Sequence, residues 1–122
     1  MTKKKAKPKT RRQLQIGEVI RRLIAREIEE YVVDSHIDGD FLTIMHADIS
    51  PDLRYCKVVY RCKVCNRDKY QKLLDGVTNE LSSVIYKRLK MRVRPEIRFI
   101  FDDVLLAIEE IERVVKKSRE VH

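Results

Sequence analysis

Hydrophobic residues recur at three- and four-residue steps between residues 13 and 33, which is the spacing of an amphipathic helix. The stripe includes Ile20, Ile24 and Ile28, and we expect it to face a core. The acidic and polar residues from Asp34 to Asp40 then interrupt the periodicity and predict a loop.

Residues 41–49 predict a strand whose alternation changes register part of the way along. The apolar positions up to Ile44 fit one register, whereas those from Ala47 onward fit the other. A bulge near Met45 or His46 would place both sets on the buried face. We therefore expect a bulged strand here.

A turn and a second strand follow. Ser50-Pro51-Asp52 predicts the turn, because proline presets φ and the flanking polar side chains can bond nearby backbone. Residues 56–64 alternate between apolar side chains and a largely cationic set that includes Lys57 and Arg61. One face of the sheet is thus expected to be covered and the other to meet water.

Helical spacing returns over residues 67–90, with two interruptions. Gly76 and Asn79 are both poor residues for a helix interior, which predicts either a kink or two helices joined by a tight turn. Residues 97–101 alternate as a third strand, and residues 104–115 carry a last helical stripe.

The predicted order is helix, strand, strand, kinked helix, strand, helix. A hairpin and one strand returned by a helix make a three-stranded sheet, and all the helices can lie on its single apolar face. The fold class is therefore α+β, a two-layer sandwich. We expect one domain over residues 13–119, preceded by a disordered basic tail over residues 1–12.

Composition narrows the class of protein. The 122 residues fit one domain, and they contain neither a long uncharged apolar run nor the apolar core of a secretory signal. Three cysteines in a chain without an export signal favour a reducing compartment. We therefore expect a cytoplasmic protein with no membrane contact.

The net charge of +8 comes mainly from the tail, since seven of the 27 basic residues lie in residues 1–12. The tail can be a solubilising arm or a tether to phosphate.

Elsewhere in the sequence, acidic and basic residues are segregated. Acids fill residues 27–40 and 102–112, whereas bases dominate residues 54–72 and 87–98. Two basic runs bracketing the kinked helix favour nucleic acid over charged faces that are merely solvated. Without tryptophan, stacking platforms for single strands are not expected.

Cys62 and Cys65 form a single CxxC pair. A zinc site needs four ligands and no second pair exists, so no metal is predicted. A thiol-redox or metal-binding module that uses these two cysteines remains an alternative, and the redox interpretation is favoured by the motif's position where a strand meets a helix. Cys62 continues the inward alternation of its strand, however, which favours simple packing in the core.

No glycine-rich phosphate loop or nucleophile motif is present in the sequence, and we predict no enzyme.

Two segments resemble signatures of a known family. Residues 47–58 (ADISPDLRYCKV) resemble the segment that crosses the hairpin in bacterial ribosome-binding factor A, and residues 86–102 (YKRLKMRVRPEIRFIFD) look like that family's second signature. Residues 104–112 resemble its final helix. The similarity extends in order over about residues 11–117.

The resemblance implies a type II KH domain without enzymatic activity. We also expect no cofactor and a monomer when the protein is free. The resemblance further implies binding to the assembling small ribosomal subunit through its rRNA, and help with late rRNA maturation, notably in the cold. The family replaces the Gly-x-x-Gly of other KH domains by a kinking Ala-x-Gly. An ungapped count back from Pro95 places this site on Val77, Thr78 and Asn79, with Gly76 as a competing position.

The predicted interface is basic. In this interpretation the kinked helix presents its turn to RNA backbone, and seven cations neutralise phosphates. These are Arg54, Lys57, Lys87, Arg88, Lys90, Arg92 and Arg94. A protein–protein adaptor without nucleic acid is the remaining alternative, which affinity insensitive to salt would reveal.

Overall fold

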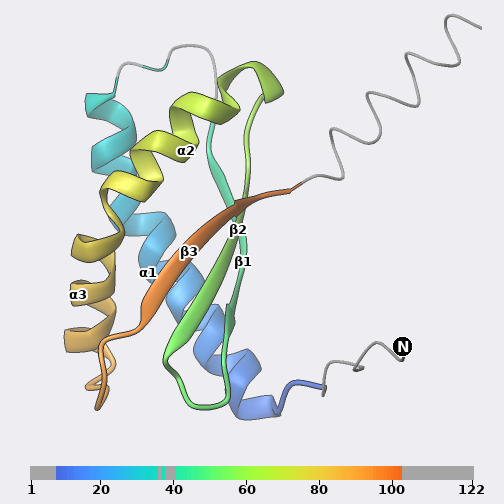
Figure 1. The fold of residues 1–122 in the computed structure, drawn as a ribbon, viewed down its shortest axis with the longest axis vertical. Helices are drawn as coiled ribbons and strands as arrows, with labels where there is room; N and C mark the ends of the chain where they lie inside the picture. Colours follow the sequence, from blue (N-terminus) through green and yellow to red (C-terminus); the bar gives the residue numbers. More distant parts are fainter. Residues whose placement is uncertain (1–7, 36, 38–40, 103–122) are drawn as a thin grey trace, which may run out of the picture.

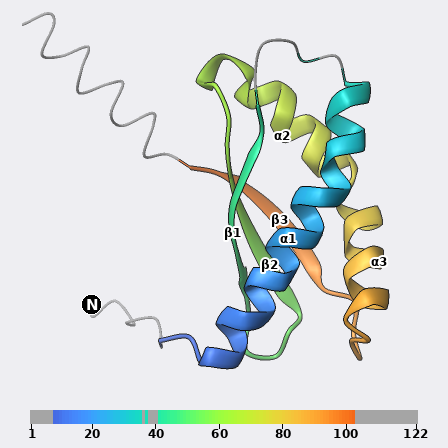
Figure 2. The ribbon, with the colours of Figure 1, turned by 180° about the vertical axis from the view of Figure 1, so that it is seen from behind.

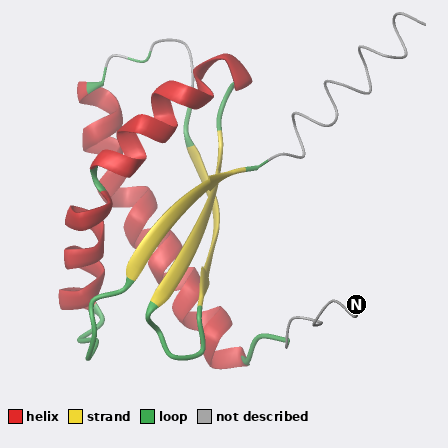
Figure 3. Cartoon of the chain, viewed as in Figure 1, coloured by secondary structure: helices red, strands yellow, loops and turns green. Residues whose placement is uncertain are grey.

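A computed structural model describes residues 8–35, 37 and 41–102 of the chain. Figure 3 shows its helices and strands. In chain order they are α1 (Arg11–Asp34), β1 (Thr43–Ile49), β2 (Tyr55–Arg61), a 3-10 turn (Val64–Asn66), α2 (Arg67–Gly76), α3 (Thr78–Arg88) and β3 (Glu96–Phe101). The predicted last helix, at residues 104–115, lies outside the described residues.

The three strands form one sheet in the order β1-β2-β3, with β1 antiparallel to β2 and β2 parallel to β3. Figures 1 and 2 show α1, α2 and α3 together on one side of this sheet. The predicted α+β two-layer sandwich is therefore confirmed for the described part of the chain. No helix within that part is both long and apolar enough to cross a bilayer.

Helix α1 starts two residues earlier than the sequence pattern indicated. Thr10 caps it: the Gln13 N–H donates to the Thr10 hydroxyl at 3.2 Å, and the Thr10 N–H donates to the Gln13 side chain at 3.0 Å. This reciprocal capping box satisfies two backbone donors that a helix start leaves open. Arg11 and Arg12 therefore belong to the helix, and the boundary drawn at residue 12 for the basic tail is too late.

Strand β1 carries the predicted bulge, because its pairing with β2 shifts between Ile44 and His46. The shift places both Ile44 and Ala47 in the core. Helix α1 approaches this strand very closely at Gly17, where an added Cβ would meet the Ala47 carbonyl oxygen far inside van der Waals contact. Only glycine fits this crossing of helix and strand.

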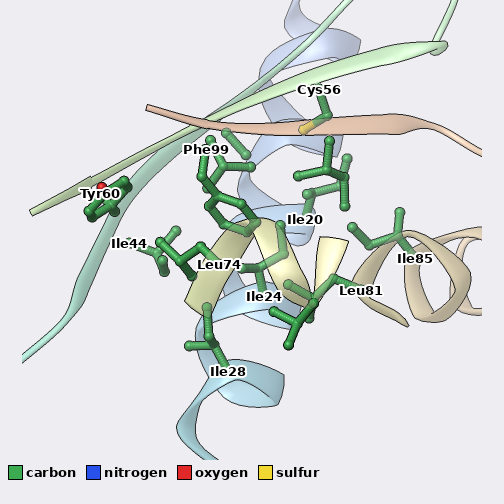
Figure 4. Packing of buried hydrophobic residues seen from close by; sticks show 14 of the residues in the cluster. Ile20, Ile24, Ile28, Ile44, Cys56, Tyr60, Leu74, Leu81, Ile85 and Phe99 are labelled. Atoms are coloured by element: carbon green, nitrogen blue, oxygen red, sulfur yellow. The ribbon is translucent and has the colours of Figure 1, made fainter. Parts of the chain in front are cut away.

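The core lies between the helices and the sheet, as Figure 4 shows. Helix α1 supplies Ile20, Ile24 and Ile28, all at most 3% exposed, at the four-residue spacing of one helix face. The strands and the other two helices supply the facing side chains. These include Ile44, Cys56, Tyr60, Leu74, Leu81, Ile85 and Phe99.

The predicted interruption of the second helical region is a break between two helices. Helix α2 ends at Gly76, Val77 has φ −113° and ψ 7°, and α3 begins at Thr78. Val77 is buried, which fixes the break against the core. An added Cβ at Gly76 would meet nothing within 4 Å, so space does not require a glycine there.

Candidate nucleic-acid interface

All seven cations of the predicted interface are exposed, but they come from three places in the fold. Arg54 follows the turn between β1 and β2, and Lys57 lies on β2. The remaining five lie in the last turn of α3 or in the connection from α3 to β3. These are Lys87, Arg88, Lys90, Arg92 and Arg94.

Most of these cations meet at one end of the molecule. Arg54, Lys90 and Arg92 line a single hollow, to which the start of α1 contributes Arg12. In Figure 1 the start of α1, the β1–β2 turn and the end of α3 all lie at the lower end of the molecule. We call the cations there the basic end. They are Arg12, Arg54, Lys87, Arg88, Lys90 and Arg92.

Arg12 is the member of the basic end that sequence reasoning missed. The run of basic residues places Arg12 in the predicted tail, which has no fixed position in the fold. The capping box formed by Thr10 and Gln13 is the signal that could have placed it in the first turn of α1.

Lys57 does not join the basic end. It lies on the sheet face away from the helices, paired across the strands with Asp48 and Arg98. Together with Tyr55 and Glu96 it lines a shallow, separate depression of mixed charge. The structure therefore separates Lys57 from the other predicted phosphate contacts.

Arg94 lies at the helix break. Its guanidinium donates a hydrogen bond to the Asn79 carbonyl oxygen in the first turn of α3. The Ser82 hydroxyl of the same helix donates to the Pro95 carbonyl oxygen. Together these bonds tie the connection before β3 to α3. The guanidinium of Arg94, although exposed, is therefore engaged by the protein's own backbone.

The charge around the break is mixed, with the exposed carboxylates Asp75 and Glu80 on either side of it. The basic end lies beyond the other end of α3, whose 11 residues span about 16 Å. The expectation that the bend itself gathers the cations is therefore not met. The cations gather where α3 ends.

Helix α1 carries its charges against its dipole. Arg11 and Arg12 stand in its first turn, where negative groups are favoured, and the helix has no basic residue in its last turn. Glu29, Glu30 and Asp34 lie near its end and form what we call the acidic end. The dipole acts mainly on charges in the terminal turns, here Arg11, Arg12 and Asp34, and each is unfavourable by about 0.3–1 kcal/mol, so helix stability does not explain this distribution.

The carboxylate of Asp52 is used to shape the β1–β2 turn. It accepts a hydrogen bond from the Ser50 hydroxyl at 2.6 Å and another from the Arg54 N–H at 3.2 Å. The hydrogen bond from the Ser50 hydroxyl, followed by the weaker effect of the Arg54 N–H, holds the pKa of Asp52 below its usual value. Asp52, which lines the same hollow as Arg54, is thus committed to the turn that presents this arginine.

The cysteines divide as packing predicts. Cys62 is 2% exposed in the core, whereas Cys65 is exposed. Burial, the largest cause, raises the pKa of the Cys56 thiol to about 12. Within the described ranges, no three potential ligands among histidine, cysteine, aspartate and glutamate gather to hold a metal ion.

Comparison with known proteins identifies the family. The sequence model of ribosome-binding factor A matches residues 12–115. A protein of that name from Burkholderia cenocepacia is 27% identical over 118 residues, covering 97% of this chain and 86% of the relative. One from Burkholderia ambifaria is 26% identical over the same shares.

Solved structures share the fold. Ribosome-binding factor A from Thermus thermophilus superposes with a TM-score of 0.62 at 19% identity, covering 72% of this chain and 93% of that one. A candidate ribosome-binding factor A from Thermotoga maritima gives a TM-score of 0.65 at 24% identity, covering 78% and 91%. With the family model matching nearly the whole sequence, the chain belongs to the ribosome-binding factor A family.

Proposed function

We propose that this protein binds the immature small ribosomal subunit through its rRNA and assists late maturation, by docking and without catalysis. The family gives the ribosome as the partner class. The observation that carries the proposal is the basic end, where residues from three separate segments bring exposed cations together. Such a cluster binds phosphates by releasing their counterions.

The sorted charges of α1 support this mode of docking. Its acidic end lies at the far end of a 24-residue helix, about 36 Å from the basic end. RNA would attract one end and repel the other, so a single orientation is favoured. The misplaced charges of α1 then serve orientation at the expense of helix stability.

We further propose that the free protein is a cytoplasmic monomer. As the family resemblance implies, its contribution should matter most in the cold. Docking a folded domain onto RNA needs no cofactor or metal. On this proposal the helix break at Val77 and Thr78 fixes the direction of α3, and hence the position of Lys87 and Arg88.

The test is a matched pair of charge reversals. Arg88→Glu with Arg92→Glu changes two exposed cations of the basic end, whereas Lys69→Glu with Lys72→Glu changes two exposed cations of α2 by the same net charge. Binding to purified immature small subunits is measured against salt concentration. For about five phosphate contacts the wild type should show a log–log slope of about −3.5 on single strands or −4.5 on duplex RNA.

The basic-end variant should weaken binding at least about tenfold and make the slope shallower by about 1.4–1.8, because two phosphate contacts are lost. The α2 variant should leave the slope unchanged. Equal effects of the two variants would show that only net charge matters. Affinity insensitive to salt would point to a protein adaptor and overturn the proposal.

A further inference from the structure

The hollow at the basic end has an apolar floor. Ile16, Leu53, Leu89, Met91 and Val93 line it, together with the cations already described. Its volume is about 550 Å³, within the range of about 300–1,000 Å³ typical of small-molecule sites. Four of the five apolar residues also pack against the hydrophobic core, and Val93 is 48% exposed. A floor continuous with the core is fixed in place before anything binds.

Backbone strain is concentrated at the same hollow. Within the described residues, the only non-glycine positions with positive φ are Leu53 at 62° and Lys90 at 49°. They come from two different loops, and both line this hollow. Left-handed conformations of such residues are unfavourable by about 1–2 kcal/mol each, and strain of this kind is typical of binding sites.

Lys90 occupies a position that usually holds glycine. Helix α3 ends in a cap in which the Met91 N–H donates to the Tyr86 carbonyl oxygen at 3.1 Å. In this motif the residue between the helix end and the donor adopts the left-handed conformation, and glycine is preferred there. A lysine at this position carries its charge to the rim of the hollow.

We propose that the hollow holds one unpaired RNA nucleotide, with its base on the apolar floor and its phosphates against Arg12, Arg54, Lys90 and Arg92. This inference rests on the proposed function and refines it. Charge complementarity selects the occupant, since among the described residues that line the hollow there are four cations and one carboxylate, Asp52, which is engaged by the turn. A fully paired duplex buries its bases and could reach only the rim.

Six short RNA hairpins with a common stem test the proposal with the full-length protein. One hairpin is fully paired, four carry a single-nucleotide bulge with one of the four bases, and one carries an abasic bulge. The wild type should bind at least one bulged hairpin about fivefold more tightly than the abasic one, the factor expected from burying ~40 Å² of apolar surface.

Two variants distinguish the contribution of base contacts from that of phosphate contacts. Leu53→Asn introduces a residue that tolerates the left-handed backbone and removes an apolar side chain from the floor. It should therefore abolish the preference for the bulged base over the abasic site. Lys90→Gly relieves the strain and removes a cation, so the preference should persist while the salt slope becomes shallower by about 0.7–0.9. Thermal unfolding of both variants checks that each remains folded.

Equal affinity of the wild type for all bulged and abasic hairpins would overturn the inference. The salt-dependent binding that supports the proposed function would still stand in that case. Displacement of the RNA from the hollow by an apolar acidic peptide, without any discrimination between base and abasic site, would assign the hollow to a protein partner instead. Loss of all salt-dependent RNA binding would remove the proposed function as well.

Discussion

The two ends of α1 are both capped by hydrogen bonds, but they differ in what surrounds them. At its end, Ser35 closes the helix without strain: its N–H donates to the Tyr31 and Val32 carbonyl oxygens, and its hydroxyl also donates to Val32. At its start, the neighbouring loops place Leu53 and Lys90 in left-handed conformations around a hollow. Strained backbone and clustered positive charge thus coincide around the start of α1, and on the proposed function the stability lost there serves binding.

The close crossing of α1 over β1 near the basic end gives the largest expected effect. Gly17→Ala should destabilise the protein by about 1–3 kcal/mol, because a Cβ cannot fit against the Ala47 carbonyl group and the helix must move. Gly76→Ala is the matched control, since its Cβ meets open space in a helical position; it should be neutral or stabilise by up to about 1 kcal/mol. Urea unfolding measures both. Similar destabilisation by the two variants would show that the close crossing is not limiting.

Reversing one charge at each end of α1 separates stability from binding. Arg12→Glu should raise the free energy of unfolding by about 0.3–1 kcal/mol, because an acid at a helix start suits the dipole, yet weaken RNA binding by about tenfold. Asp34→Lys, in the last turn at the acidic end, should stabilise by a similar amount and leave the RNA affinity unchanged or higher. A variant at position 12 that keeps full affinity would contradict the assignment of Arg12 to the interface.

Relief of backbone strain at Lys90 should raise the free energy of unfolding, whatever its effect on RNA binding. Lys90→Gly is expected to stabilise the fold by about 0.5–1 kcal/mol, because glycine adopts a φ of 49° without the Cβ penalty. Lys87→Gly, in the last turn of the same helix, is the control and should destabilise by a similar amount. Destabilisation by both substitutions would mean that the left-handed cap is not strained.

The smallest effect concerns pH and the β1–β2 turn. The pKa of Asp52 is lowered in the folded state, first by the Ser50 hydroxyl and then by the Arg54 N–H. Its contribution to stability is therefore fully present above the unfolded-state pKa of about 3.9 and is lost as the pH falls through the lower folded-state value. Unfolding between pH 7 and pH 3 should depend less on pH in Asp52→Asn than in the wild type. Identical pH profiles would show that the carboxylate does not stabilise the turn.

Local pattern was enough to predict much of the fold. The change of alternation between Ile44 and Ala47 locates the bulge, because only an extra residue can keep both on the buried face. The poor helix formers near residue 77 likewise indicate the break before Thr78. These features depend on neighbouring residues, which a sequence displays directly.

The site depends on contacts between distant segments, which the sequence does not display. Arg12, Arg54 and Arg92 are separated by about 40 residues each, and they meet only because β3 runs parallel to β2 and returns the end of α3 to the β1–β2 turn. The same topology turns Lys57 to the other sheet face and leaves Arg94 bonded to Asn79. Charge runs along the chain therefore predicted a basic surface but misplaced its centre.

Sedimentation of the tagged protein through a sucrose gradient of native lysate tests the central claim most directly. We expect the wild type and the Lys69→Glu/Lys72→Glu control to migrate with free small subunits and to be absent from translating ribosomes. The Arg88→Glu/Arg92→Glu variant should remain at the top of the gradient while still folded. Migration of this variant with small subunits at the wild-type level would contradict docking through the basic end.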